Sequence, residues 1–189
     1  QQTRIAQGIA YYYRFMEKFP SIEDLAAAHE DEVLKIWQGL GYYSRARNLH
    51  YAAKQIVNEY HSIFPNTFDE LKKIKGIGDY TAAAIASIAF NQPVPVVDGN
   101  VYRVLSRLYG ISAPIDTSAG KKLFFELANK LIDRKKPGDF NQALMEYGAI
   151  QCTPRKPDCV KCIFQNDCIA QKENQVEKLP VKQNKLKIR

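Results

Sequence analysis

The chain has 189 residues, of which 46% are hydrophobic, so it is long and apolar enough to fold without disulfide support and is not a disordered segment. Its 27 lysines and arginines exceed its 20 aspartates and glutamates, and the resulting net charge of +7 favours a polyanionic partner such as nucleic acid. No apolar run approaches the roughly 20 residues of a membrane helix, so we expect no membrane segment. No export signal is visible, and we therefore expect an intracellular protein, in the cytoplasm or nucleoid of a bacterium or the nucleus of a eukaryote.

Helical periodicity dominates the chain and no convincing alternating strand is found, which predicts an all-α fold. Pro20 ends the first helix, and Ser21 with Asp24 has the spacing of a capping box for the second. Glycines and prolines mark the later breaks. The helices are expected at 3–19, from 21 onward, at 31–37, from about 48 to 60, within 71–90, and at 98–109, 118–133 and 140–150.

Aromatic and cationic side chains occur together just after the glycine break at residues 39–41. Tyr42 is followed by Arg45 and Arg47, and this mixture suits DNA because arginines bind phosphates and an aromatic ring wedges between bases. The alternative is a helix start with core tyrosines and solvated arginines. The three histidines of the chain show no ligand spacing and are expected to be ordinary ones.

Segment 71–90 reads as a helix, a glycine turn and a second helix. Gly76 and Gly78 enclose one apolar residue, and glycine permits positive φ and close approach of a partner to the backbone. Asp79 or Thr81 is placed to cap the second helix, so that free N–H groups face outward and suit a DNA phosphate. A plain turn between helices would explain the same residues.

A carboxylate, Asp98, begins the helix that follows this segment, after Pro93 and Pro95. Such a group could stabilise positive charge that develops in a reaction. An aspartate before Gly-Asn-Val is also a common N-cap, so the pattern alone leaves both roles open.

The chain has four cysteines, and all lie near its C-terminal end with the spacing C-x6-C-x2-C-x5-C. They are Cys152, Cys159, Cys162 and Cys168. Four thiolates in one loop of a chain without an export signal indicate a metal site and not disulfides. Structural zinc sites usually have two close Cys-x-x-Cys pairs, and a single such pair favours a [4Fe–4S] cluster without excluding zinc.

Residues 74–82 and 97–104 together resemble the helix-hairpin-helix and catalytic-aspartate signature of the endonuclease III superfamily of DNA glycosylases, and the cysteine spacing resembles the iron–sulfur loop of that superfamily. The resemblance implies two helical subdomains that flank a DNA-binding cleft. The expected parts are a six-helix-barrel subdomain at 1–97 with the hairpin motif at about 71–90, an iron–sulfur subdomain at 98–170 with its cluster loop at 152–168, and a linker at 171–189 leading to a further domain.

Within that superfamily the chain most resembles the MutY-type adenine DNA glycosylases. Residues 39–49 match their wedge segment, which implies that Tyr42 intercalates, and Gln1 and Gln2 match glutamines that enter the duplex near the lesion. The resemblance implies a monomer with a [4Fe–4S] cluster that binds double-stranded DNA and hydrolyses the N-glycosidic bond of adenine mispaired with 8-oxoguanine or guanine.

The same resemblance implies the site residues. Asp98 matches the catalytic carboxylate, with Tyr80 and Asn100 expected to position it. Tyr80 stands where bifunctional relatives have a Schiff-base lysine, so a monofunctional enzyme is implied. Backbone contacts to DNA are expected from Arg45, Arg47, Gly76, Gly78, Tyr80 and Thr81.

The sequence starts after the position of the family's general-acid glutamate and stops before its lesion-recognition domain, so we expect a truncated catalytic core with impaired excision. A thymine–guanine mismatch glycosylase of the same superfamily is the alternative enzyme, since it also has tyrosine at the position of Tyr80. A DNA-binding module without catalysis is the alternative of a different class.

Overall fold

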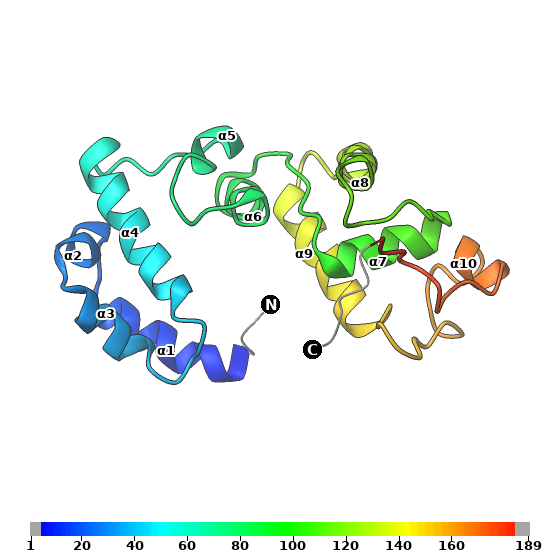
Figure 1. Cartoon of the computed structure of the whole chain (residues 1–189), viewed down its shortest axis with the longest axis horizontal. Helices are drawn as coiled ribbons and strands as arrows, with labels where there is room; N and C mark the ends of the chain where they lie inside the picture. The colour runs from blue at the N-terminus through cyan, green and yellow to red at the C-terminus, as the bar shows by residue number, and fades with distance from the viewer. Residues whose placement is uncertain (1–4, 184–189) are drawn as a thin grey trace. The chain divides into compact units, whose positions relative to one another are not determined.

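The computed structural model describes residues 5–183, and the regular secondary structure of this part of the chain is all helical with no strand, as predicted. Its helices are α1 (Ile5–Lys18), α2 (Ile22–Ala27), α3 (Glu30–Trp37), α4 (Ser44–Glu59), α5 (Phe68–Leu71), α6 (Asp79–Phe90), α7 (Gly99–Tyr109), α8 (Ser118–Leu131), α9 (Pro137–Ile150) and α10 (Ile169–Lys172) (Figure 1). None of these helices is long and apolar enough to cross a membrane.

The chain divides into two compact units, residues 1–82 and 83–189, and the division falls inside α6. The sequence predicted a subdomain boundary later, after residue 97. A physical reason for the earlier division is that the end of α6 is bonded to the second unit, where Asn141 of α9 donates a 2.9 Å hydrogen bond to Ser87.

The first unit is built around α4, which packs against α2 and α3 (Figure 1). Local capping starts its short helices: the Ser21 hydroxyl accepts from the Asp24 amide, and the Asp24 carboxylate accepts from the Ser21 amide, which is the predicted capping box. The core consists of small and apolar side chains from four segments, namely Phe19, Leu25, Val33, Ala46 and Ala53.

The second unit is built around α7, which packs against α9 and α10. In Figure 1, α9 crosses beneath α7 and the helix pair forms the centre of this unit. Gly148 of α9 permits the close approach, because a Cβ atom there would lie 2.7 Å from Cβ of Asn100 on α7. The core of the unit includes Val101, Leu105, Phe124 and Met145.

The part of the predicted linker that the structure describes, residues 171–183, is docked on the second unit. Leu179 is only 3% exposed, and its carbonyl accepts a 3.1 Å hydrogen bond from Arg107. The Ile115 amide donates to the Val181 carbonyl, and the Gln183 amide donates to Asp116. This stretch therefore covers α7 before the chain continues.

Candidate active site

Asp98 is the N-cap of α7, and its carboxylate is held by three hydrogen bonds. Oδ1 accepts from the backbone amides of Asn100 and Val101, both at 2.9 Å, and Oδ2 accepts from the side-chain amide of Asn100 at 3.1 Å. The side chain is half-buried. The capping interpretation is thus confirmed, and it also fixes the orientation of a carboxylate that lies beside the positive end of a helix.

A chain of hydrogen bonds leads from Asp98 to the cysteine loop through two residues of α7. Asn100 donates to Asp98, and the Asn100 oxygen accepts from Arg103 at 2.8 Å. Arg103 also donates to the carbonyls of Cys152 at 2.7 Å and Gly148 at 2.6 Å. Burial lowers the pKa of the Arg103 guanidinium, while Cys152 and Asp98 act in the opposite direction.

All four cysteines line one pocket in the second unit, next to Arg107. Within residues 5–183, however, no three side chains of His, Cys, Asp or Glu converge closely enough to hold a single metal ion. Burial is the main cause that raises the pKa of the Cys159 thiol, and the nearby Cys152 raises it further.

Polar groups surround the sulfur atoms of this pocket. Arg107 lies 3.5 Å from Cys152 Sγ, and Cys162 Sγ lies 2.9 Å from the Tyr147 hydroxyl and 3.4 Å from the Phe164 amide. Burial and the contact with Cys162 raise the pKa of Tyr147, so its hydroxyl stays protonated and is able to donate. A buried guanidinium and two further donors suit an anionic group held by thiolates.

The glycine turn before α6 behaves as predicted at one of its two glycines. Gly76 has φ +89°, and a Cβ atom there would lie 2.6 Å from Cβ of Asn48, so the turn needs glycine at this position. Gly78 is outside the positive-φ region, and a Cβ atom there would meet nothing within 4 Å. Neither the backbone conformation nor the packing of the described residues therefore requires glycine at position 78.

The predicted capping of α6 is wrong. The helix begins at Asp79, so Asp79 and Thr81 lie within the first turn and not before it, and the Ala82 amide bonds the Gly78 carbonyl. Asp79 instead pairs with Lys72 at 2.8 Å, and this hydrogen bond raises the pKa of Lys72. The Lys72 ammonium therefore offsets the charge of a carboxylate in the first turn of α6.

Tyr42 is 66% exposed and has φ +48°, which is unusual for a large side chain and indicates local strain. The preceding turn is fixed by Trp37, whose indole donates to the Gly41 carbonyl at 3.1 Å. The Arg45 guanidinium lies 5.6 Å from the Tyr42 ring centre and 5.4 Å from that of Trp37. The structure therefore presents the ring outward, as a wedge requires.

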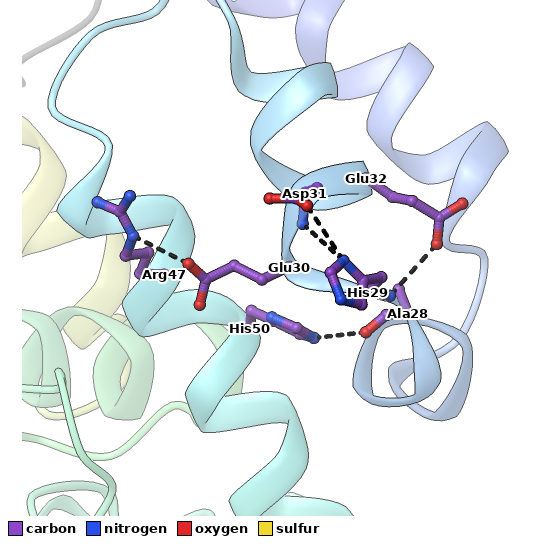
Figure 2. A network of polar contacts seen from close by, with 7 residues as sticks. All are labelled: Ala28, His29, Glu30, Asp31, Glu32, Arg47 and His50. Carbon is purple, nitrogen blue, oxygen red and sulfur yellow. Dashed lines mark hydrogen bonds and ion pairs between the residues drawn. The ribbon is translucent and has the colours of Figure 1, made fainter.

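Arg47, the next cation along α4, is engaged within the chain. Figure 2 shows its Nε atom facing Glu30 Oε1 at 3.1 Å, with both side chains about half exposed. In the same view His50 points to the Ala28 carbonyl at 3.1 Å, and the exposed His29 caps α3. Burial lowers the pKa of His50. Both histidines bond groups of the chain itself, which agrees with the expectation of ordinary histidines.

The structure brings together three of the predicted groups: Asp98 with Asn100, Tyr42 with Arg45, and the four cysteines. Tyr80 is 41% exposed in the first turn of α6 and belongs to the first unit, whereas Asp98 belongs to the second. Gln1 and Gln2 lie outside the described residues.

Three residues that support the site were not predicted: Arg103 and Arg107, four positions apart on α7, and Asn141 on α9. All three are less than 9% exposed. By helical periodicity the two arginines share a face of α7 with Asn100 and Ser106, opposite Val101 and Leu105, so the pattern predicts a solvated pair and contains no signal for their burial.

Comparisons with known proteins agree with this geometry. The model of the family described as HhH-GPD superfamily base excision DNA repair protein matches residues 1–132. The chain is similar to the adenine DNA glycosylase of Rattus norvegicus, with 48% identity over 171 residues that cover 90% of this chain and 33% of that protein. It therefore spans about a third of the length of that relative.

Two solved structures share the fold. A thermostable thymine-DNA glycosylase has a TM-score of 0.83 and 31% identity, covering 92% of this chain and 80% of its own. Endonuclease III in a non-covalent complex with DNA has a TM-score of 0.75 and 26% identity, covering 92% of this chain and 79% of its own.

Proposed function

Because the chain belongs to the HhH-GPD superfamily of base excision DNA repair proteins, we propose that it excises adenine mispaired with 8-oxoguanine or guanine in double-stranded DNA. The observation that carries the proposal is the Asp98 carboxylate, fixed at the start of α7 in a chain 48% identical to an adenine DNA glycosylase. The thymine-DNA glycosylase structure is less similar, at 31% identity, and adenine is therefore preferred over thymine.

Asp98 stabilises the positive charge that develops on the sugar during the reaction. When the N-glycosidic bond breaks, its electron pair leaves with the base and the deoxyribose becomes an oxocarbenium ion. An anion that is already oriented stabilises this ion electrostatically or as a transient covalent partner, and water then supplies the new oxygen at the sugar carbon. The hydrogen bonds to Asn100 and Val101 keep the carboxylate in place without reorganisation.

Tyr80 and Asn100 complete the proposed catalytic set. A phenol does not form an imine with the sugar, so the enzyme is monofunctional and leaves the DNA strand uncut. Asn100 already contacts Asp98 and connects it to Arg103.

The first unit carries the proposed contacts to the duplex. Tyr42 wedges between bases to help expel the adenine, with Arg45 beside its ring. The turn at Gly76 and Gly78, followed by Tyr80 and Thr81, holds a backbone phosphate. We also assign Arg47, Gln1 and Gln2 to DNA contacts, and expect a monomer.

The cysteine pocket is proposed to hold a [4Fe–4S] cluster through Cys152, Cys159, Cys162 and Cys168. Four thiols that line one pocket, with a single Cys-x-x-Cys pair among them, favour a cluster over a single zinc ion. The cluster, when bound, would cross-link the cysteine loop to the rest of the unit. Arg107 and Tyr147 would orient the thiolates and offset their charge.

Single-turnover excision from matched duplexes by the full-length protein tests the proposal. Four duplexes that differ only at one pair, adenine–oxoguanine, adenine–guanine, thymine–guanine and adenine–thymine, should give base release from the first two alone. Release of thymine but not adenine would establish the alternative enzyme. Tight binding of the first duplex without any release would establish a binding module.

A further inference from the structure

The segment that delivers Asp98 to its place has no helical structure of its own. Residues 91–98 connect α6 to α7, and prolines at 93 and 95 remove two backbone donors from it. Nevertheless Pro95 and Val96 are buried. An irregular buried segment needs hydrogen-bond partners from elsewhere in the fold.

Asn141 supplies these partners. It lies on α9 and is 1% exposed, and its oxygen accepts a 3.0 Å hydrogen bond from the Val96 amide. Its nitrogen donates at 2.9 Å to the Val94 carbonyl and at 2.9 Å to the Ser87 hydroxyl. One side chain therefore bonds the segment on both sides of Pro95, and the last of these bonds lies two residues before Asp98.

The helix that carries Asn141 is itself fixed against the elements at both ends of the segment. At its start, a Cβ atom on Gly138 would lie 2.9 Å from the Ser87 carbonyl oxygen of α6. At its end, one on Gly148 would lie 2.7 Å from Asn100 Cβ of α7. Helix α9 thus contacts the end of α6 and the start of α7, with Asn141 between these two contacts.

We infer that Asn141 is a positioning residue for Asp98. By fixing the extended segment that precedes α7, Asn141 determines where the Asp98 carboxylate lies. The inference rests on the proposed excision of adenine. A carboxamide is required because the segment offers one donor and one acceptor, and aspartate or leucine cannot satisfy both. A displacement of about 1 Å at a reacting group is enough to cost about 100-fold in rate.

The test compares Asn141→Leu with two control variants. Leucine has nearly the same size and shape but forms none of the hydrogen bonds. Asn141→Leu should lower single-turnover excision by about 10- to 100-fold while the dissociation constant for the mispaired duplex stays within about twofold, since binding of the ground state does not depend on Asp98. Ser87→Ala removes the Asn141 bond that lies away from the segment, together with the Ser87 bonds to Ala83 and Ala84 within α6, and it should excise at nearly the wild-type rate.

The second control separates positioning from stability. Ile132 is buried at the end of α8, and Ile132→Ala or Ile132→Val is chosen to match the loss of melting temperature in Asn141→Leu. At a temperature where all variants are folded, the control should keep its excision rate. Equal rates for the control and Asn141→Leu would overturn the inference, whereas absence of adenine excision by the wild type would overturn only the proposed function.

Amide hydrogen exchange of the wild-type protein tests the inference without an activity assay and without a variant. The Val96 amide belongs to no helix, yet it should exchange with solvent as slowly as the amides at the centre of α9, because its acceptor is a buried side chain. Fast exchange at Val96 would show that Asn141 does not hold the segment, even if Asn141→Leu failed to fold.

Discussion

Helices α4 and α7 each carry two arginines beside a residue that we assign to the reaction, Tyr42 in the first case and Asp98 in the second. On α4, Arg47 is 54% exposed at its side chain and pairs with a carboxylate in solvent. On α7, Arg103 and Arg107 are 8% and 3% exposed and donate mainly to backbone carbonyls. The exposed Arg47 is available to a polyanion, whereas the buried arginines of α7 determine how their own unit is built.

The largest effect should come from Arg107. It donates to the carbonyls of Thr153, Pro154 and Leu179, and Arg107→Met would leave the buried Leu179 carbonyl without this donor. A buried unsatisfied group costs about 1–3 kcal/mol and the two less buried carbonyls add less, so the variant should lose at least about 2 kcal/mol of unfolding free energy. Urea unfolding measures the loss, and Arg107→Lys should restore little because an ammonium cannot reproduce the planar fork.

The matched variant on α4 is Arg47→Met. An exposed ion pair is worth about 0–1 kcal/mol, so its unfolding midpoint should barely change. If Arg47→Met and Arg107→Met destabilised the protein equally, the contrast between the two helices would be wrong.

The next effect concerns Arg103, which is bonded to both Asn100 and the cysteine loop. Arg103→Met should reduce single-turnover excision at least about tenfold, because Asn100 loses the partner that orients it toward Asp98. DNA affinity should change much less. Excision at the wild-type rate by folded Arg103→Met would show that the bond to Asn100 does not matter for the reaction.

A smaller effect is expected when the partner of Arg47 is removed. Glu30→Gln frees Arg47 for phosphate and should tighten DNA binding, whereas Arg47→Gln should weaken it and reduce the salt slope by about 0.9 for the lost phosphate contact. Both affinities come from titrations over a range of salt concentrations. Glu30→Gln with unchanged affinity and slope would remove Arg47 from the DNA-binding surface.

The smallest effect is a pH dependence that arises from α4. Burial lowers the pKa of His50 in the folded state, so below its unfolded value of about 6.5 the unfolded chain binds the proton more readily. This contribution to stability is complete above that pH and is lost as the pH falls through the folded pKa. Unfolding of the wild type and His50→Gln between about pH 5 and 7 should therefore give a steeper slope for the wild type.

Features that depend on neighbours in sequence could be predicted. The capping box of Ser21 and Asp24 requires only two residues three positions apart, and the N-cap role of Asp98 requires only the residues that follow it. The four cysteines share a pocket because their spacing places them in one loop. In each case the interacting residues lie close together in the sequence, so the sequence pattern alone is enough to predict that they meet.

The partners of the buried groups could not be predicted. Arg107 bonds carbonyls that lie 46 to 72 residues later, and any residue can supply a carbonyl. Asn141 likewise contacts Val94 and Val96 through their backbone. The burial of Leu179 could not be predicted, because a lysine-rich segment has the composition of a linker whether or not one of its leucines is buried.

The central claim is that Asp98 stabilises the cation formed when adenine leaves, and Asp98→Asn tests it most directly. Asparagine can still cap α7, so the fold should persist, and any loss of the cap itself costs only about 1 kcal/mol. We predict that single-turnover excision of adenine opposite oxoguanine falls below detection while affinity for that duplex is retained. Excision at a rate close to that of the wild type would contradict the account, and so would parallel loss of folding and binding.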